Sequence, residues 1–265
     1  MLYYILQLFF SFLLFYTFFS TGLFFLVKED TVNITETNLM ALFLLNLLSI
    51  LISYFFSRFS RRNHASFSIW ISSFRFKQKN LALVFFILLF QCIITLIFTG
   101  FNSYSFSLRA FIITILFFFF SAFWEEFIFR GFFFRLLSSK RKKRNRERFI
   151  YYLIIFQAVL FSLAHIKNPA VNVLKLLNIF LAGIFLGILA LQNFKEAVLF
   201  HFSWNFLQAF VFGFPVSGYK LENHLLNTNS FLEWEDYYST GVIFILASLF
   251  LFYKKHQKKG ISNAI

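Results

Sequence analysis

The chain has 265 residues, of which 59% are hydrophobic and 14% charged, whereas soluble domains usually carry about 25% charged residues. This composition excludes an ordinary water-soluble globule. The formal net charge of +14 would suit a nucleic-acid-binding protein, but the basic residues cluster in short connections between apolar runs, as membrane topology rules expect. We therefore expect the lipid bilayer as a partner and no nucleic acid.

Apolar runs follow one another along the whole chain, and most of them are long enough to cross a hydrocarbon core. They cover residues 2–27, 39–56, 81–100, 110–137, 149–166, 176–192, 197–213 and, more briefly, 241–253. We predict an all-α, polytopic membrane protein of about eight transmembrane helices. No connection is long enough for a soluble domain.

The single membrane domain divides into three parts. Residues 1–109 hold the N-terminal transmembrane helices, about three in number, and residues 110–213 hold a core in which polar residues interrupt the apolar runs. Residues 214–265 hold an outer connection, the last transmembrane helix and a basic tail. The first run is too long for the apolar part of a signal peptide, so we expect it to be retained as a span.

Charge predicts which connections face the cytoplasm. Residues 57–80 and 140–148 are rich in arginine and lysine, and so is the tail at residues 254–259, which places all three in the cytoplasm. Both termini are then cytoplasmic. The chain shows no transit peptide or retention signal, and its one cysteine, Cys92, permits no internal disulfide, which favours a bacterial plasma membrane.

Two adjacent glutamates, Glu125 and Glu126, lie deep in the fourth apolar run. A charge at the centre of a transmembrane helix costs about 2.5–3.5 kcal/mol on insertion scales, so a functional reason is expected. On a helix Glu126 and Arg130 are i and i+4 neighbours, while Glu125 points about 100° away. We interpret Glu126 as structural and Glu125 as chemical, the alternative being a buried ion-pair cluster with no chemistry.

Two histidines also belong to predicted spans. His165 follows Phe161 by four residues in the fifth run, and His201 precedes Asn205 by four in the seventh, so each pair shares a helix face. Polar contacts between helices are the simpler interpretation. Taken with the glutamates, these side chains supply a general base, groups that position water or a metal, and donors for an oxyanion, which suits hydrolysis of an acyl bond.

Three spaced motifs occur in order, each in its own apolar run. They are EExxxR (Glu125, Glu126, Arg130), FxxxH (Phe161, His165) and HxxxN (His201, Asn205). This order resembles the CAAX protease and bacteriocin-processing (CPBP) family of intramembrane endopeptidases, which includes type II CAAX prenyl endopeptidases. The resemblance covers roughly residues 110–213.

The resemblance implies a role for each motif. Glu125 and His165 would activate the water that attacks the peptide carbonyl, and His201 and Asn205 would stabilise the oxyanion, while the other two EExxxR residues would brace the site. The motifs do not decide between a glutamate and a metal mechanism, since one glutamate and two histidines can also bind zinc. The metal is therefore unknown, with zinc as a candidate cofactor.

The expected substrate is a peptide or protein at the membrane. The resemblance implies prenylated CAAX proteins for some members, whereas in a bacterium we favour processing of, or immunity to, secreted peptides. A proton-coupled carrier is an alternative that also needs buried carboxylates and histidines, although we find no internal repeat. A non-catalytic immunity or scaffold protein is a third possibility.

The depth of the motifs presents a conflict. A helix starting at Phe149 places His165 at its far end, whereas His201 lies about one turn into a helix starting at Ala197, so straight spans would not bring them together. Either the helices start elsewhere, or the connection at residues 193–196 dips into the membrane. We predict that Glu125, His165, His201 and Asn205 converge.

Overall fold

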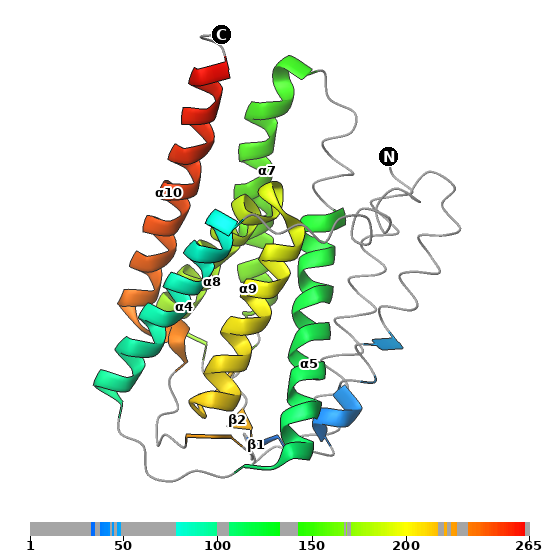
Figure 1. The fold of residues 1–265 in the computed structure, drawn as a ribbon. Helices are drawn as coiled ribbons and strands as arrows, with labels where there is room; N and C mark the ends of the chain where they lie inside the picture. The colour runs from blue at the N-terminus through cyan, green and yellow to red at the C-terminus, as the bar shows by residue number, and fades with distance from the viewer. Residues whose placement is uncertain are drawn as a thin grey trace.

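The computed structural model gives an all-α fold in the part of the chain that it describes (Figure 1). The described residues are 33–34, 38–42, 44, 47–48, 78–99, 106–132, 143–166, 168, 171–216, 220–221, 224–226 and 233–262. The first predicted span, most of the second and the basic connection up to residue 77 lie outside these residues.

Six long helices make up the described fold. They are α4 (Gln78–Phe98), α5 (Leu108–Glu126), α7 (Lys143–Ala164), α8 (Val173–Gln192), α9 (Phe194–Phe206) and α10 (Tyr238–Ser262). Two π-helical segments continue α5 and α9 without a break, η1 (Phe127–Phe132) and η2 (Leu207–Val211), and a 3-10 turn, η3 (Trp234–Asp236), precedes α10. Two short strands, β1 (Asn33–Ile34) and β2 (Lys220–Leu221), pair in parallel.

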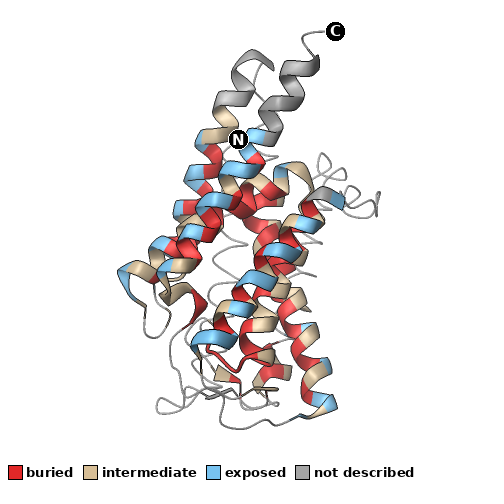
Figure 2. Cartoon of the chain, turned by 60° about the vertical axis from the view of Figure 1, so that its left-hand side comes forward, coloured by how far each residue is buried: buried red, intermediate tan, exposed pale blue. Residues whose placement is uncertain are grey.

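Several of these helices suit a lipid environment. Within the described residues three segments are long and apolar enough to cross a membrane, Asn80–Phe98, Leu108–Gly131 and Val173–Gln192, and two shorter apolar helices run over Phe149–Ala164 and Tyr238–Tyr253. The outer helices carry exposed positions along their length (Figure 2), as helices that face lipid must. The chain is a helical membrane protein, but the expected count of about eight spans is not confirmed by the described residues.

Aromatic side chains lock the central helices together. Phe185 of α8, Phe200 of α9 and Phe244 of α10 are almost fully buried, and the ring centroids of Phe185 and Phe200 lie 4.9 Å apart. Helix α7 packs closely on α8 because Gly183 has no side chain: a Cβ there would lie 3.0 Å from Ala158. These contacts fix the helices that surround the polar residues.

The conflict over depth is settled by where the helices begin. Helix α7 starts at Lys143 rather than Phe149 and extends well past the turn between α8 and α9 (Figure 1). Helix α9 starts at Phe194, three residues before the expected Ala197, directly after the single residue Asn193. His165 therefore follows the end of α7 close to His201, which lies about two turns into α9.

A buried carboxylate holds the turn between α8 and α9. Glu196 is fully buried and accepts hydrogen bonds from Asn80 Nδ2 at 2.6 Å and Asn193 Nδ2 at 2.9 Å. The backbone N–H of Lys195 donates to Asn193 Oδ1 at 3.1 Å, which satisfies one polar group of the turn. The starting points of the helices thus account for the convergence, and entry of residues 193–196 into the membrane stays a prediction.

Candidate active site

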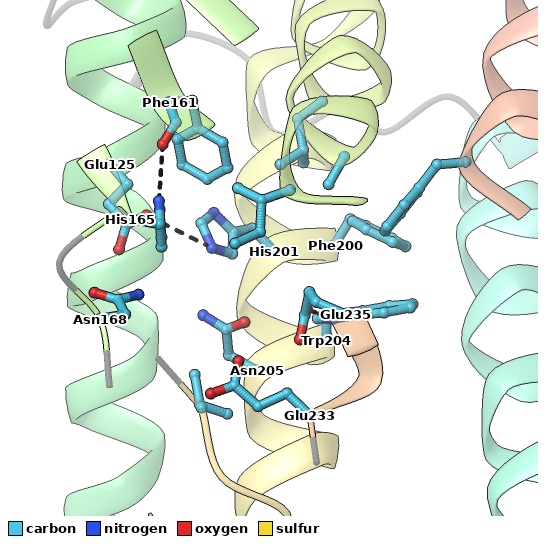
Figure 3. A pocket seen from close by; sticks show the side chains of 15 residues that line it. Glu125, Phe161, His165, Asn168, Phe200, His201, Trp204, Asn205, Glu233 and Glu235 are labelled. Carbon is cyan, nitrogen blue, oxygen red and sulfur yellow. Dashed lines mark hydrogen bonds and ion pairs between the residues drawn. The ribbon is translucent and has the colours of Figure 1, made fainter. Parts of the chain in front are cut away.

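One pocket gathers the polar residues of the three motifs (Figure 3). Glu125, His165, His201 and Asn205 all line it, so the structure brings the four predicted side chains together. The cavity volume is about 60 Å³, and about 10–15 Å³ is enough to hold one water molecule. The pocket therefore has room for several waters beside these groups.

The two adjacent glutamates have different surroundings. Glu126 is fully buried, and its Oε1 lies 2.8 Å from Arg130 Nη1 and 2.9 Å from His201 Nδ1. The Glu125 side chain is 19% exposed, and its Oε2 lies 3.8 Å from His201 Nε2. Ser121 Oγ donates to the other oxygen of Glu125 at 3.3 Å. Glu126 is thus held by a cation and an imidazole, while Glu125 faces the pocket.

Hydrogen bonds orient both histidine rings. His165 Nδ1 lies 2.8 Å from the carbonyl oxygen of Phe161, and because a carbonyl only accepts, this nitrogen carries the proton. In His201, Nδ1 donates to the Glu126 carboxylate, whose Oε1 also lies 2.8 Å from Arg130 Nη1. Each ring therefore has its Nε2 left for chemistry, and that of His201 is directed at Glu125.

Phe161, the first residue of FxxxH, packs against three of these groups. Its ring lies 4.3 Å from Arg130 Cζ, a cation–π distance. The same ring has its centroid 4.9 Å from that of His165 and 6.0 Å from that of His201. Phe161 thus covers the buried guanidinium, packs beside both imidazoles, and accepts a hydrogen bond from His165 through its backbone carbonyl.

Gln157, a polar residue of the fifth apolar run, belongs to the same network although its sequence spacing matched no motif. It is fully buried in α7, and its Nε2 donates to Gly183 O at 2.8 Å. Arg130 Nη2 reaches the same carbonyl at 3.5 Å. A buried amide within an apolar helix was a signal that could have indicated this residue.

The two helices that carry the EExxxR and HxxxN motifs, α5 and α9, both change to π-helix at the site. Helix α5 ends at Glu126 and continues as η1, while α9 ends at Phe206, one residue after Asn205, and continues as η2. The ion pair between Glu126 and Arg130 spans the first of these junctions. Single π-helical turns inside α-helices are rare and often occur at functional sites.

One carboxylate and two imidazoles among the pocket residues, those of Glu125, His165 and His201, are groups that zinc can bind. Across the described ranges, no three His, Cys, Asp or Glu side chains are grouped as ligands of one ion. The Nδ1 atoms of His165 and His201 are both engaged in hydrogen bonds, so a metal would have to bind through the Nε2 atoms and the Glu125 carboxylate. The steps proposed below use protein groups alone.

The family comparison covers the part of the chain that contains all three motifs. Residues 106–207 match the family described as type II CAAX prenyl endopeptidase Rce1-like. This stretch is Rce1-like. The Rce1-like stretch spans 102 of the 265 residues and confirms the resemblance drawn from the motifs. A comparison with curated proteins finds no match.

The pocket extends beyond the Rce1-like stretch, which ends at Leu207. Glu233 and Glu235, in the connection before α10, line the wall together with Phe244 of α10 itself. The sequence motifs did not indicate these residues, because no local spacing links them to α9.

Proposed function

We propose that the chain is an intramembrane endopeptidase that hydrolyses peptide bonds of membrane-associated or secreted peptides and proteins. The observation that carries this proposal is the Glu125 carboxylate, which faces a water-sized cavity together with His165, His201 and Asn205. The Rce1-like stretch supports a peptidase of the CAAX protease type, and a peptide or protein substrate follows from that class.

Glu125 is the proposed general base. It takes a proton from a water molecule in the pocket while the water oxygen attacks the carbonyl carbon of the substrate. The π electrons of the C=O bond then move onto the carbonyl oxygen, which becomes the oxyanion. The Nε2 of His165 accepts a hydrogen bond from the other O–H of that water and so orients it, because Nδ1 of the same ring donates to Phe161 O. A fixed nucleophile lowers the entropic part of the barrier.

His201 and Asn205 are the proposed oxyanion donors. The amide of Asn205 offers N–H groups from the same face of α9. For His201 to donate, its Nε2 must also carry a proton, which gives an imidazolium flanked by Glu126 and Glu125 at 2.9 and 3.8 Å. Donors held in place before the charge develops stabilise the tetrahedral intermediate.

The intermediate collapses when the carbon–nitrogen bond breaks. Glu125 returns its proton to the leaving nitrogen, so the products are an amine and a carboxylic acid, and the base is restored. Glu126 and Arg130 take no part in proton transfer in this scheme. They hold His201 in orientation and satisfy one another's charge inside the bilayer.

The membrane orientation is part of the proposal. The basic start of α7 and the basic end of α10 lie at the same end of the molecule (Figure 1), which supports a cytoplasmic location for both by the positive-inside rule. We propose a bacterial plasma membrane with both termini in the cytoplasm. The cytoplasmic location proposed for the N-terminus is argued from the charge pattern of the sequence alone.

The test is cleavage by the purified protein in liposomes against a mixed peptide library, with new termini identified by mass spectrometry. We expect wild type to cleave and Glu125→Ala and His165→Ala to lose cleavage, since each removes a group that acts on water. Glu147→Ala, in the first turns of α7, is the matched control and should retain activity. Folded wild type that cleaves no peptide would favour the carrier or scaffold alternatives.

A further inference from the structure

The η3 segment, residues 233–237, borders the pocket from outside the Rce1-like stretch (Figure 3). Its Trp234 is fully buried, with the ring centroid 4.7 Å from that of Trp204. Glu233 and Glu235, on either side of that tryptophan, both line the pocket. The segment is therefore anchored between α8, α9 and the cavity.

Polar contacts tie the η3 segment to α8. Asn178 Nδ2 donates to the backbone oxygens of Glu235 and Tyr237 at 2.8 and 2.9 Å. The buried Lys175 Nζ lies 3.3 Å from Glu233 Oε1 and 3.4 Å from Asp236 Oδ2. Because α8 holds both the backbone and the carboxylates of the segment, the Glu235 side chain starts from a fixed position.

The Glu235 carboxylate in turn holds α9. Its Oε1 accepts from Trp204 Nε1 at 2.6 Å, and its Oε2 accepts from Gln208 Nε2 at 3.3 Å. Trp204 and Gln208 are i and i+4 neighbours, as are His201 and Asn205, and the two pairs lie about 60° apart around the helix axis. Because both pairs belong to one helix, a contact that fixes the rotation of α9 at Trp204 also fixes the directions of His201 and Asn205.

This contact is placed where α9 changes its helical form. Trp204 belongs to the α-helical part and Gln208 to η2, which begins at Leu207. Gln208 Nε2 also donates to Pro215 O at 2.6 Å. A switch from α to π geometry alters the direction of every later side chain, so a carboxylate that binds residues on both sides of the switch fixes its location.

We infer that Glu235 is a positioning residue, which through Trp204 fixes the rotation of α9 and thereby aims His201 and Asn205 at the reacting carbonyl. This inference rests on the proposed function. Glu235 touches Trp204 and Gln208 rather than the proposed reacting atoms, so its removal should lower the rate of the chemical step and leave substrate binding nearly unchanged.

The kinetic test uses Glu235→Gln, which keeps the size of the side chain but turns one acceptor into a donor facing another donor. We expect kcat to fall about tenfold or more, as for a lost hydrogen bond to a charged group, with KM within about twofold of wild type. Glu147→Gln, the same chemical change in the first turns of α7, is the control. A changed KM with unchanged kcat would instead make Glu235 a substrate contact and overturn the inference.

A double-mutant cycle with Trp204→Phe separates positioning from general damage. If the two residues act through one contact, the double variant should be no slower than Glu235→Gln alone. If the two fold-losses of kcat multiply in the double variant, in proteins of equal folded fraction, the contact between Glu235 and Trp204 does not transmit the effect on the chemical step.

A second measurement does not depend on activity. In ¹⁵N-tryptophan-labelled protein in micelles, Trp204→Phe identifies the indole signal of Trp204, and Glu235→Gln should shift that signal while Glu147→Gln should not. An unmoved signal would overturn the inference even if the protein cleaves peptides. A shifted signal in a protein that cleaves nothing would refute the proposed function and leave the contact itself established.

Discussion

Removing either charge of the buried pair between Glu126 and Arg130 should destabilise the protein more than removing both. Both side chains are fully buried, and the carboxylate also holds His201 Nδ1 at 2.9 Å. Breaking a buried ion pair by losing one partner costs about 3–5 kcal/mol, because the remaining charge is uncompensated, whereas replacing both partners is often nearly neutral. We expect losses of this size for Glu126→Gln and for Arg130→Met, and a smaller loss for the double variant.

The free energy of unfolding can be followed by tryptophan fluorescence in mixed micelles of rising denaturing detergent. In Glu126→Gln the side-chain oxygen can still accept a hydrogen bond from His201 Nδ1, so the double variant also tests whether charge or hydrogen bonding orients that ring. Recovery of stability without recovery of cleavage would show that the charge itself supports the chemistry. If the two single losses simply add in the double variant, the side chains are not coupled and the proposed bracing is refuted.

Three further predictions concern the base, the metal and the helix packing. Glu125→Gln should lower cleavage by about 10²- to 10⁴-fold, the usual contribution of a general base, in a peptide-release assay on equally folded protein; retained activity would remove Glu125 from the mechanism. A metal chelator should leave cleavage unchanged if protein groups alone activate the water as proposed, and a loss of cleavage that added zinc restores would instead assign a metal to the site. Gly183→Leu should destabilise the protein by about 1–3 kcal/mol through overpacking against Ala158, seen as a lower thermal aggregation temperature, whereas unchanged stability would mean that α7 and α8 can move apart freely.

The sequence was most informative where the chemistry is local. The long continuous apolar runs predict a helical membrane protein, because a helix satisfies its backbone groups in lipid within its own segment. The pairing of Glu126 with Arg130 follows from a spacing of four residues on one helix, and that spacing also leaves Glu125 on a different face. Phe161 and His165 are linked in the same way, although the covering of Arg130 by the Phe161 ring needed the fold.

Only the tertiary structure decided the relative depth of the helices and the full extent of the pocket. An apolar run ends at the first charged residue, so hydropathy placed the start of this helix at Phe149. Backbone hydrogen bonding continues α7 back through the basic residues to Lys143. Glu235 meets Trp204 across 31 positions of sequence, and no periodicity connects residues so far apart. Motif spacing therefore determined which residues carry the proposed chemistry, while packing between distant segments determined how they are aimed.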